Sequence, residues 1–75
     1  MEIYFYNHWL GLNHRFPSLE VATPHVKEHY ENLLQHRTDN TGDAQWQEEI
    51  SKSIECWERD IRTNYGSLDA LYSFA

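Results

Sequence analysis

The sequence predicts a mainly α-helical fold with a small β element, an α+β arrangement in which an antiparallel helical hairpin carries an N-terminal β-hairpin or extended arm. Three observations predict it: a helical repeat of apolar residues in the second half, a shorter apolar stripe before it, and a strand-like aromatic segment at the start. An all-α domain of three helices is the alternative. With 75 residues, the chain is expected to form a single small domain, residues 1–75.

Residues 1–22 are predicted to form an aromatic arm or β-hairpin. The sequence EIYFY is rich in residues that favour strands. A lone strand leaves backbone groups unpaired, so it needs a second strand. The candidate is RFPSLEVAT, reached through a turn at LGLNH. Alternation along the first strand would place Ile3 and Phe5 in the core and leave Tyr4 and Tyr6 near the surface.

The first long helix is predicted over residues 24–37. Thr23 can cap it, and Pro24 suits the first helical position, where its missing N–H costs nothing. One apolar stripe follows, made of Val26, Tyr30, Leu33 and Leu34. The sequence TDNTGD then predicts a short turn, so the two long helices should pack as an antiparallel hairpin.

The second long helix, residues 44–65, has the strongest pattern. Its apolar residues recur at helical spacing and fall within a stripe about 100° wide. They are Trp46, Ile50, Ile54, Trp57, Ile61 and Tyr65. Asp43 is the predicted N-cap, and Gly66 should follow the last turn. Three ion pairs at i,i+4 are expected on the other face: Glu48–Lys52, Glu55–Arg59 and Glu58–Arg62.

Residues 67–75 are predicted to form a short C-terminal helix or a tail. Ser67 would cap it, and Leu68, Leu71 and Tyr72 would turn inward. At 1.5 Å per residue the two long helices should measure about 21 Å and about 33 Å. Part of the longer helix should therefore be covered by the arm, by the tail or by another molecule.

The chain is acidic, with a formal net charge of −6 at pH 7. Residues 39–75 hold eight acidic and three basic residues, which puts a net −5 in this half. Nucleic-acid binding needs a basic patch and is not expected, whereas an acidic surface suits a larger protein with a basic surface. A membrane span needs about 20 apolar residues, and no run approaches this, so no membrane contact is expected. Together with a single cysteine, this favours a cytoplasmic location.

Three histidines of the first long helix, His25, His29 and His36, are candidate metal ligands because they fall within about 40° of one another. The set lacks the glutamate of an H-E-x-x-H motif and has no cysteine at ligand spacing. We therefore expect no metal and no other cofactor, with a histidine-based metal-binding protein as an alternative function. Cys56 has acidic neighbours and no partner base, and the hairpin should leave little room for a pocket, so no enzyme activity is expected.

The stretch NYGSLDALY, residues 64–72, resembles the Tyr-Gly-x-x-Leu-Asp-Ala-Leu-Trp motif of the barstar family of ribonuclease inhibitors. In that family an acidic helix blocks a basic active site. The resemblance covers about nine residues and is one residue short between Gly66 and Leu68, and Ser73 replaces the second aspartate of the motif. The family's fold is therefore not carried over, and only Asp69 matches an inhibitory position.

Size, acidity and the lack of a catalytic motif favour a small acidic protein-binding module. We expect an inhibitor that sterically blocks a larger basic, nucleic-acid-handling host protein, as phage or mobile-element anti-defence proteins of the anti-CRISPR type do. A structural subunit that self-associates into a homodimer is an alternative. The expected partner-binding residues are Tyr4, Tyr6, Trp9, Glu48, Glu49, Asp60 and Asp69.

Overall fold

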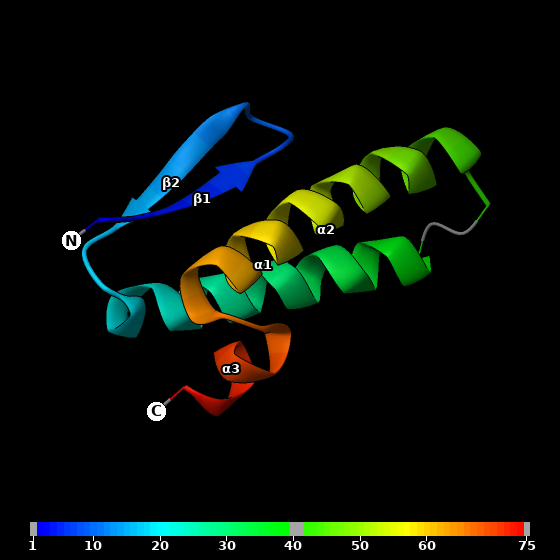
Figure 1. Ribbon diagram of the computed structural model, residues 1–75. Helices are drawn as coiled ribbons and strands as arrows, with labels where there is room; N and C mark the ends of the chain where they lie inside the picture. Colours follow the sequence, from blue (N-terminus) through cyan, green and yellow to red (C-terminus); the bar gives the residue numbers. More distant parts are fainter. Residues whose placement is uncertain (1, 40–41, 75) are drawn as a thin grey trace.

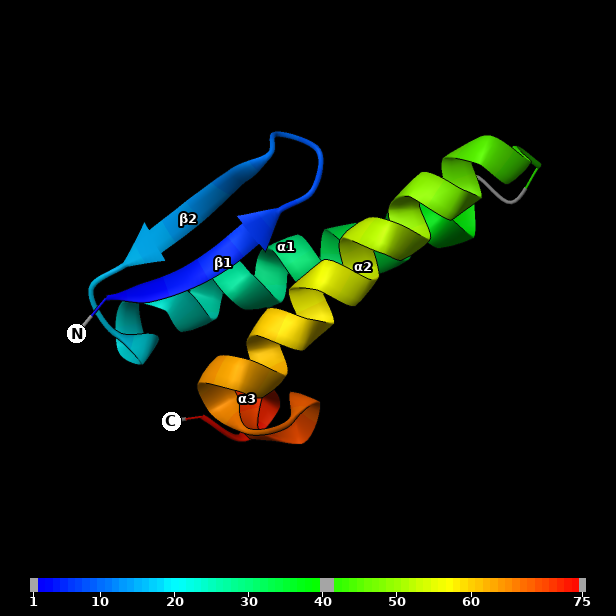
Figure 2. The same ribbon diagram turned by 45° about the horizontal axis from the view of Figure 1, so that its top comes forward.

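The fold is mainly helical with one β-hairpin, as predicted, and a computed structural model describes it for residues 2–39 and 42–74 (Figure 1). The elements in chain order are β1 (Ile3–Asn7), β2 (Leu12–Phe16), α1 (Leu19–Asp39), α2 (Ala44–Tyr65) and α3 (Leu68–Ser73). The long helices α1 and α2 run antiparallel side by side. The hairpin lies on one side of this pair and α3 on the other, near the C-terminal end of α2 (Figure 2).

The hairpin pairs β1 and β2 antiparallel, from Ile3 opposite Phe16 to Asn7 opposite Leu12. Gly11 has a φ of 63°, which glycine adopts at little cost, and its N–H donates to the Asn7 carbonyl at 2.9 Å. The turn therefore ends at Gly11, four residues after the last residue of β1. The second strand is therefore LNHRF, and our prediction that it lies in RFPSLEVAT was wrong for most of that segment.

The two faces of β1 differ as predicted. Ile3 and Phe5 are buried, and so is Asn7 at the end of the strand. Tyr4 is 44% exposed, and Tyr6 is half-buried.

Helix α1 begins at Leu19, five residues before the predicted start at Pro24. Ser18 caps it, because its side-chain oxygen accepts from the Val21 N–H at 3.3 Å. Thr23, the predicted cap, is buried inside the helix, where its hydroxyl donates to the Leu19 carbonyl and contacts the Tyr65 hydroxyl at 2.7 Å. Packing of this first turn therefore continues the helix through Pro24.

This longer α1 removes the predicted mismatch between the helices. The structure gives α1 21 residues and α2 22 residues. The predicted difference in length was therefore wrong, but the cover expected for α2 is present, because β1 of the arm and α3 of the tail both pack against it. The predicted end of the first helix near residue 37 is also two residues early, since α1 continues to Asp39.

Helix α2 has the predicted bounds, 44–65, and the predicted caps. The Asp43 carboxylate accepts from the Trp46 N–H at 3.0 Å, and the Gly66 N–H donates to the Arg62 carbonyl at 2.9 Å. Of the three expected i,i+4 ion pairs, the described residues form Glu48–Lys52, at 3.6 Å. Glu58 instead accepts from the Tyr30 hydroxyl at 2.7 Å, which links α1 to α2. Burial raises the pKa of Tyr30 to about 12, so it stays a donor at neutral pH.

The predicted C-terminal helix is α3, and Ser67 caps it by accepting from the Ala70 N–H at 3.0 Å. Leu71 is fully buried and Leu68 packs against the core. Tyr72 was predicted to turn inward, but it is 48% exposed and its ring lies 5.8 Å from the Lys27 ammonium. A six-residue helix on this surface can bury only one narrow stripe.

Phe5 of β1 lies at the centre of the contact between the hairpin and α2. The Phe5 ring has no exposed surface, and its centroid lies 5.1 Å from Trp57, 6.2 Å from Phe16 and 6.5 Å from Tyr65. The hairpin therefore supplies a central core residue and is no loose appendage. None of the helices in the described ranges has the length and apolar character that a bilayer span requires.

Candidate functional site

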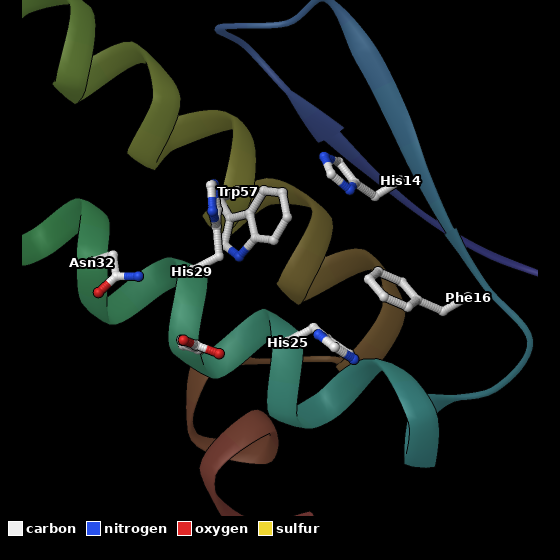
Figure 3. A pocket seen from close by; sticks show the side chains of 7 residues that line it. His14, Phe16, His25, His29, Asn32 and Trp57 are labelled. Carbon is white, nitrogen blue, oxygen red and sulfur yellow. The ribbon is translucent and has the colours of Figure 1, made fainter.

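A groove between β2 and α1 is the clearest concave site among the described residues. It exists because β1 packs on α2 while β2 stands farther from the helices (Figure 2). Its first cavity is about 280 Å³. Figure 3 shows the lining side chains: His14 and Phe16 come from β2, and Trp57 from α2 closes the back. The remaining lining residues belong to α1 and are His25, Glu28, His29 and Asn32.

Aromatic contacts fix the shape of this cavity. The His29 ring lies 4.3 Å from the Trp57 ring, and the His14 ring approaches the same indole edge-on at 6.2 Å. Phe16 stacks on His25 at 5.8 Å with an interplanar angle of 20°. The Trp57 indole N–H donates to the Val26 carbonyl at 3.3 Å, which holds the ring in place. The walls of the cavity are thus planar rings whose positions are already fixed by these contacts.

The electrostatics of the cavity centre on His29. Burial lowers its pKa, and the nearby His14 lowers it further. At pH 7 the His29 imidazole is therefore neutral and offers one donor and one acceptor nitrogen. A neutral ring beside Trp57 suits flat or apolar groups better than it suits a free anion.

A second cavity of about 300 Å³ continues the groove toward the hairpin turn. His29 and Asn32 line both cavities. The second cavity is otherwise lined by Trp9, Leu33, His36, Trp46 and Ile50. The Trp9 ring packs against Trp46 at 5.0 Å with the two planes tilted by 37°, and the Trp46 indole N–H is buried with no acceptor among the described residues. We call these two cavities the histidine groove.

The prediction of little room for a pocket was therefore too strict. Each cavity is close to the lower size of small-molecule sites, about 300 Å³. The space for these cavities lies in the groove between β2 and α1. A helical hairpin alone, as predicted, would not form this groove. Sequence reasoning also missed His14, since LGLNH was interpreted as a turn. The available signal was the alternation of Leu12, His14 and Phe16.

The three predicted metal-ligand candidates do not meet at one point. His25 lines the first cavity, His36 lines the second, and His29 lies on the wall that they share. Within residues 2–39 and 42–74, no group of three or more histidine, cysteine or acidic side chains has a geometry that could hold a metal ion. Cys56 is half-buried and forms no disulfide.

The predicted aromatic contact residues lie on the outer side of the hairpin and at its turn. The Tyr4 hydroxyl donates to Glu2 at 2.6 Å, and the Arg15 guanidinium lies 5.6 Å from the Tyr4 ring. The hydrogen bond to Glu2 and the charge of its carboxylate raise the pKa of Tyr4. Trp9 is 43% exposed although its ring packs against Trp46.

The predicted acidic contact residues fall into separate groups. Glu49 contacts the His8 ring at 3.2 Å and so lies beside the hairpin turn, while Glu48 precedes it on α2 and shares Lys52 with it. Asp60 has an internal role, because its carboxylate accepts from the Tyr6 N–H at 2.7 Å. Asp69 is exposed on α3, past the other end of α2. The predicted residues therefore do not form one continuous surface.

Comparisons with protein-family models, with curated proteins and with solved structures found no match to this chain.

Proposed function

We propose that this protein is a small acidic protein-binding module that inhibits a larger protein with a basic surface by steric blocking. The partner class remains the one expected from the sequence, a nucleic-acid-handling protein of the cytoplasm, as for phage or mobile-element anti-defence proteins. The surface that we assign to this role is the apolar tip of the hairpin, defined as Trp9, Leu10 and Leu12, with the acidic residues next to it.

The observation that carries the proposal is the exposure of this apolar tip. Leu10 is 63% exposed, Leu12 57% and Trp9 43%. Three large apolar side chains so close together on a small protein are typical of a contact surface, since covering them releases about 25 cal/mol per Å² of apolar area. Trp9 and Leu10 lie in the turn and Leu12 begins β2, so the three exposed side chains belong to the same end of the hairpin.

The tip is also held in a defined position. Trp9 packs against Trp46, His8 contacts Glu49, and the Asn7 side chain accepts from the Leu10 N–H at 3.1 Å. A preformed patch loses little conformational freedom on binding, which favours affinity. The second cavity of the histidine groove opens beside Trp9 and can take an apolar side chain of the partner.

Acidic residues border the tip and support a basic partner. Glu48 is exposed and Glu49 half-buried in the first turns of α2, and the whole chain carries −6. The two glutamates share Lys52, and Asp60 is used inside the fold, so this array is not dense. That favours blocking by contact, with charge steering the encounter, over mimicry of a nucleic-acid backbone.

The test is capture of the partner by the immobilised protein from a lysate of its native host, at low and at physiological salt. The variant Leu10→Ser/Leu12→Ser should lose the captured protein. Val21→Ser is the matched control, because Val21 is a similarly exposed apolar residue at the far end of α1. The captured protein should be basic, and its association should slow as salt rises. Equal capture by the tip variant and the control would contradict the proposal.

A further inference from the structure

The two edges of the hairpin sheet are treated differently by the rest of the fold. At the β1 edge, the Tyr6 N–H donates to Asp60 and the Tyr4 carbonyl accepts from the Asn64 side chain at 3.2 Å. These side chains of α2 satisfy the outward backbone groups of β1. The β2 edge lies on the outer side of the hairpin in both views (Figures 1 and 2).

The register identifies which groups of β2 are free to pair. Tyr4 and Tyr6 turn their backbone groups away from β2, so they form the non-hydrogen-bonded pairs of the ladder. Their partners Arg15 and Asn13 must then turn their own N–H and C=O groups away from β1. Four of the five β2 residues are exposed, and no described residue outside the hairpin hydrogen-bonds to these groups. The β2 edge is therefore open over Asn13–Arg15.

We propose that β2 pairs antiparallel with β2 of a second copy, with the two-fold axis at His14, to form a four-stranded sheet in the order β1-β2-β2-β1. Asn13 of each copy then lies opposite Arg15 of the other. Because both residues turn their backbone groups outward, the two pairs form four N–H···O=C bonds. A strand that adds to an open edge is a common mode of association.

The sequence in and around β2 favours this register over the two nearest alternative registers. A shift that places Asn13 opposite Asn13 of the second copy also requires the Gly11 N–H, which already donates to Asn7. A shift that places Arg15 opposite Arg15 brings like charges together and sets Asn13 opposite Pro17, which has no N–H. Pairing about His14 avoids both costs and forms the most hydrogen bonds.

The side chains agree with this choice. Leu12 of one copy lies opposite Phe16 of the other, which covers an exposed leucine with a half-buried ring. The strand LNHRF holds no acidic residue, and its Arg15 is already placed over the Tyr4 ring. Although the whole chain carries −6, no acidic side chain of β2 opposes close approach of two copies.

The first experiment measures association of the full chain by sedimentation equilibrium from about 1 µM to about 1 mM. We expect a monomer–dimer equilibrium. Asn13→Pro removes two of the four N–H donors from the dimer and should raise the dissociation constant about tenfold or more. Asn13→Ala keeps these donors and is the matched control. Far-ultraviolet circular dichroism checks that each variant is folded.

The second experiment reports the register even if Asn13→Pro does not fold. In a Cys56→Ser background, His14→Cys places two thiols directly opposite each other, so mild oxidation should give a covalent dimer. Leu10→Cys is the control, since in this register the two copies of Leu12 are already about 13 Å apart at about 3.3 Å per residue, and Leu10 lies in the turn beyond Leu12. The Leu10→Cys variant should form no covalent dimer under the same oxidation.

Either of two results would overturn the proposal. One is a chain that remains monomeric to about 1 mM, in which His14→Cys does not cross-link. The other is a dimer in which Leu10→Cys cross-links as well as His14→Cys or better, since that places the turn between β1 and β2, and not the centre of β2, at the two-fold axis. A dimer that Asn13→Pro weakens and that His14→Cys traps supports it.

Discussion

The strands β1 and β2 have the same length and pair with each other, yet only β1 belongs to the core. Ile3, Phe5 and Asn7 of β1 are buried, whereas β2 has four exposed residues and one half-buried residue, Phe16. The reason is position: β1 lies against α2, and β2 stands at the outer edge of the sheet. Strand composition alone does not decide burial; the neighbouring element does.

This asymmetry also divides the roles of the hairpin. One strand is tied to α2 by rings, by the Asp60 carboxylate and by the Asn64 amide. The other keeps an open backbone edge and one wall of the histidine groove. A small fold can thus use one strand for stability and present the second strand to a ligand or partner.

The largest expected effect is the loss of unfolding free energy when one aromatic ring is removed, first from β1 and, in a separate variant, from β2. Phe5→Ala should cost about 3–5 kcal/mol of unfolding free energy, because Phe5 is fully buried among three rings. Phe16→Ala should cost about half as much, since Phe16 keeps part of its surface in water. Urea denaturation followed by circular dichroism measures both. Equal losses would mean that β2 contributes to the core as β1 does.

Loss of the carboxylate that holds the β1 edge should have an intermediate effect. Asp60→Ala should cost about 1–3 kcal/mol, because the Tyr6 N–H loses a charged acceptor in a half-buried place. Hydrogen exchange of the Tyr6 amide should become faster. Asp69→Ala removes the same charge from exposed α3 and should stay within about 0.5 kcal/mol. A Tyr6 amide that exchanges at the wild-type rate would show that the β1 edge does not depend on Asp60.

The smallest expected effect is on the pH dependence of stability, through His29 in the groove beneath β2. Burial lowers the pKa of His29, with His14 of β2 as a second cause, so the folded state favours the neutral ring. The unfolded chain then binds the proton more readily. This contribution to stability is complete above about pH 6.5 and is lost as pH falls below it.

Thermal melting between about pH 7.5 and about pH 5.5 measures this dependence. The midpoint of the wild type should fall more than that of His29→Gln, which cannot titrate. Asn32→Ala, which changes the same groove without removing a titrating group, should keep the wild-type dependence. Identical slopes in the wild type and His29→Gln would show that the groove leaves His29 as well solvated as in the unfolded chain.

Helix α2 shows how far sequence reasoning reaches. Its apolar stripe, its Asp43 cap and its terminal Gly66 all agree, and the predicted bounds 44–65 match the structure. These signals are local: a hydrogen-bonding cap, a glycine with a φ of 95° and a 3.6-residue period act within a few turns of the chain. The cap of α3 at Ser67 was predictable for the same reason.

The start of α1 shows where local signals fail. Thr23 and Pro24 have the chemistry of a helix start, but Ala22 and Thr23 are buried against the rest of the fold and the helix begins at Leu19. Tertiary packing outweighed the local preference. The same holds for Asp60, whose internal bond to Tyr6 joins residues 54 positions apart and has no sequence signature.

The sequence by itself thus determined the helical skeleton, its caps, the acidic balance and the alternation that buries Ile3 and Phe5, because each depends on neighbouring residues or on composition. Only the tertiary structure decided which strand reaches α2, which backbone edge stays open, and that His14, His25 and His29 line one groove. Those features arise where distant segments meet, and the angle of the hairpin on the helix pair sets them.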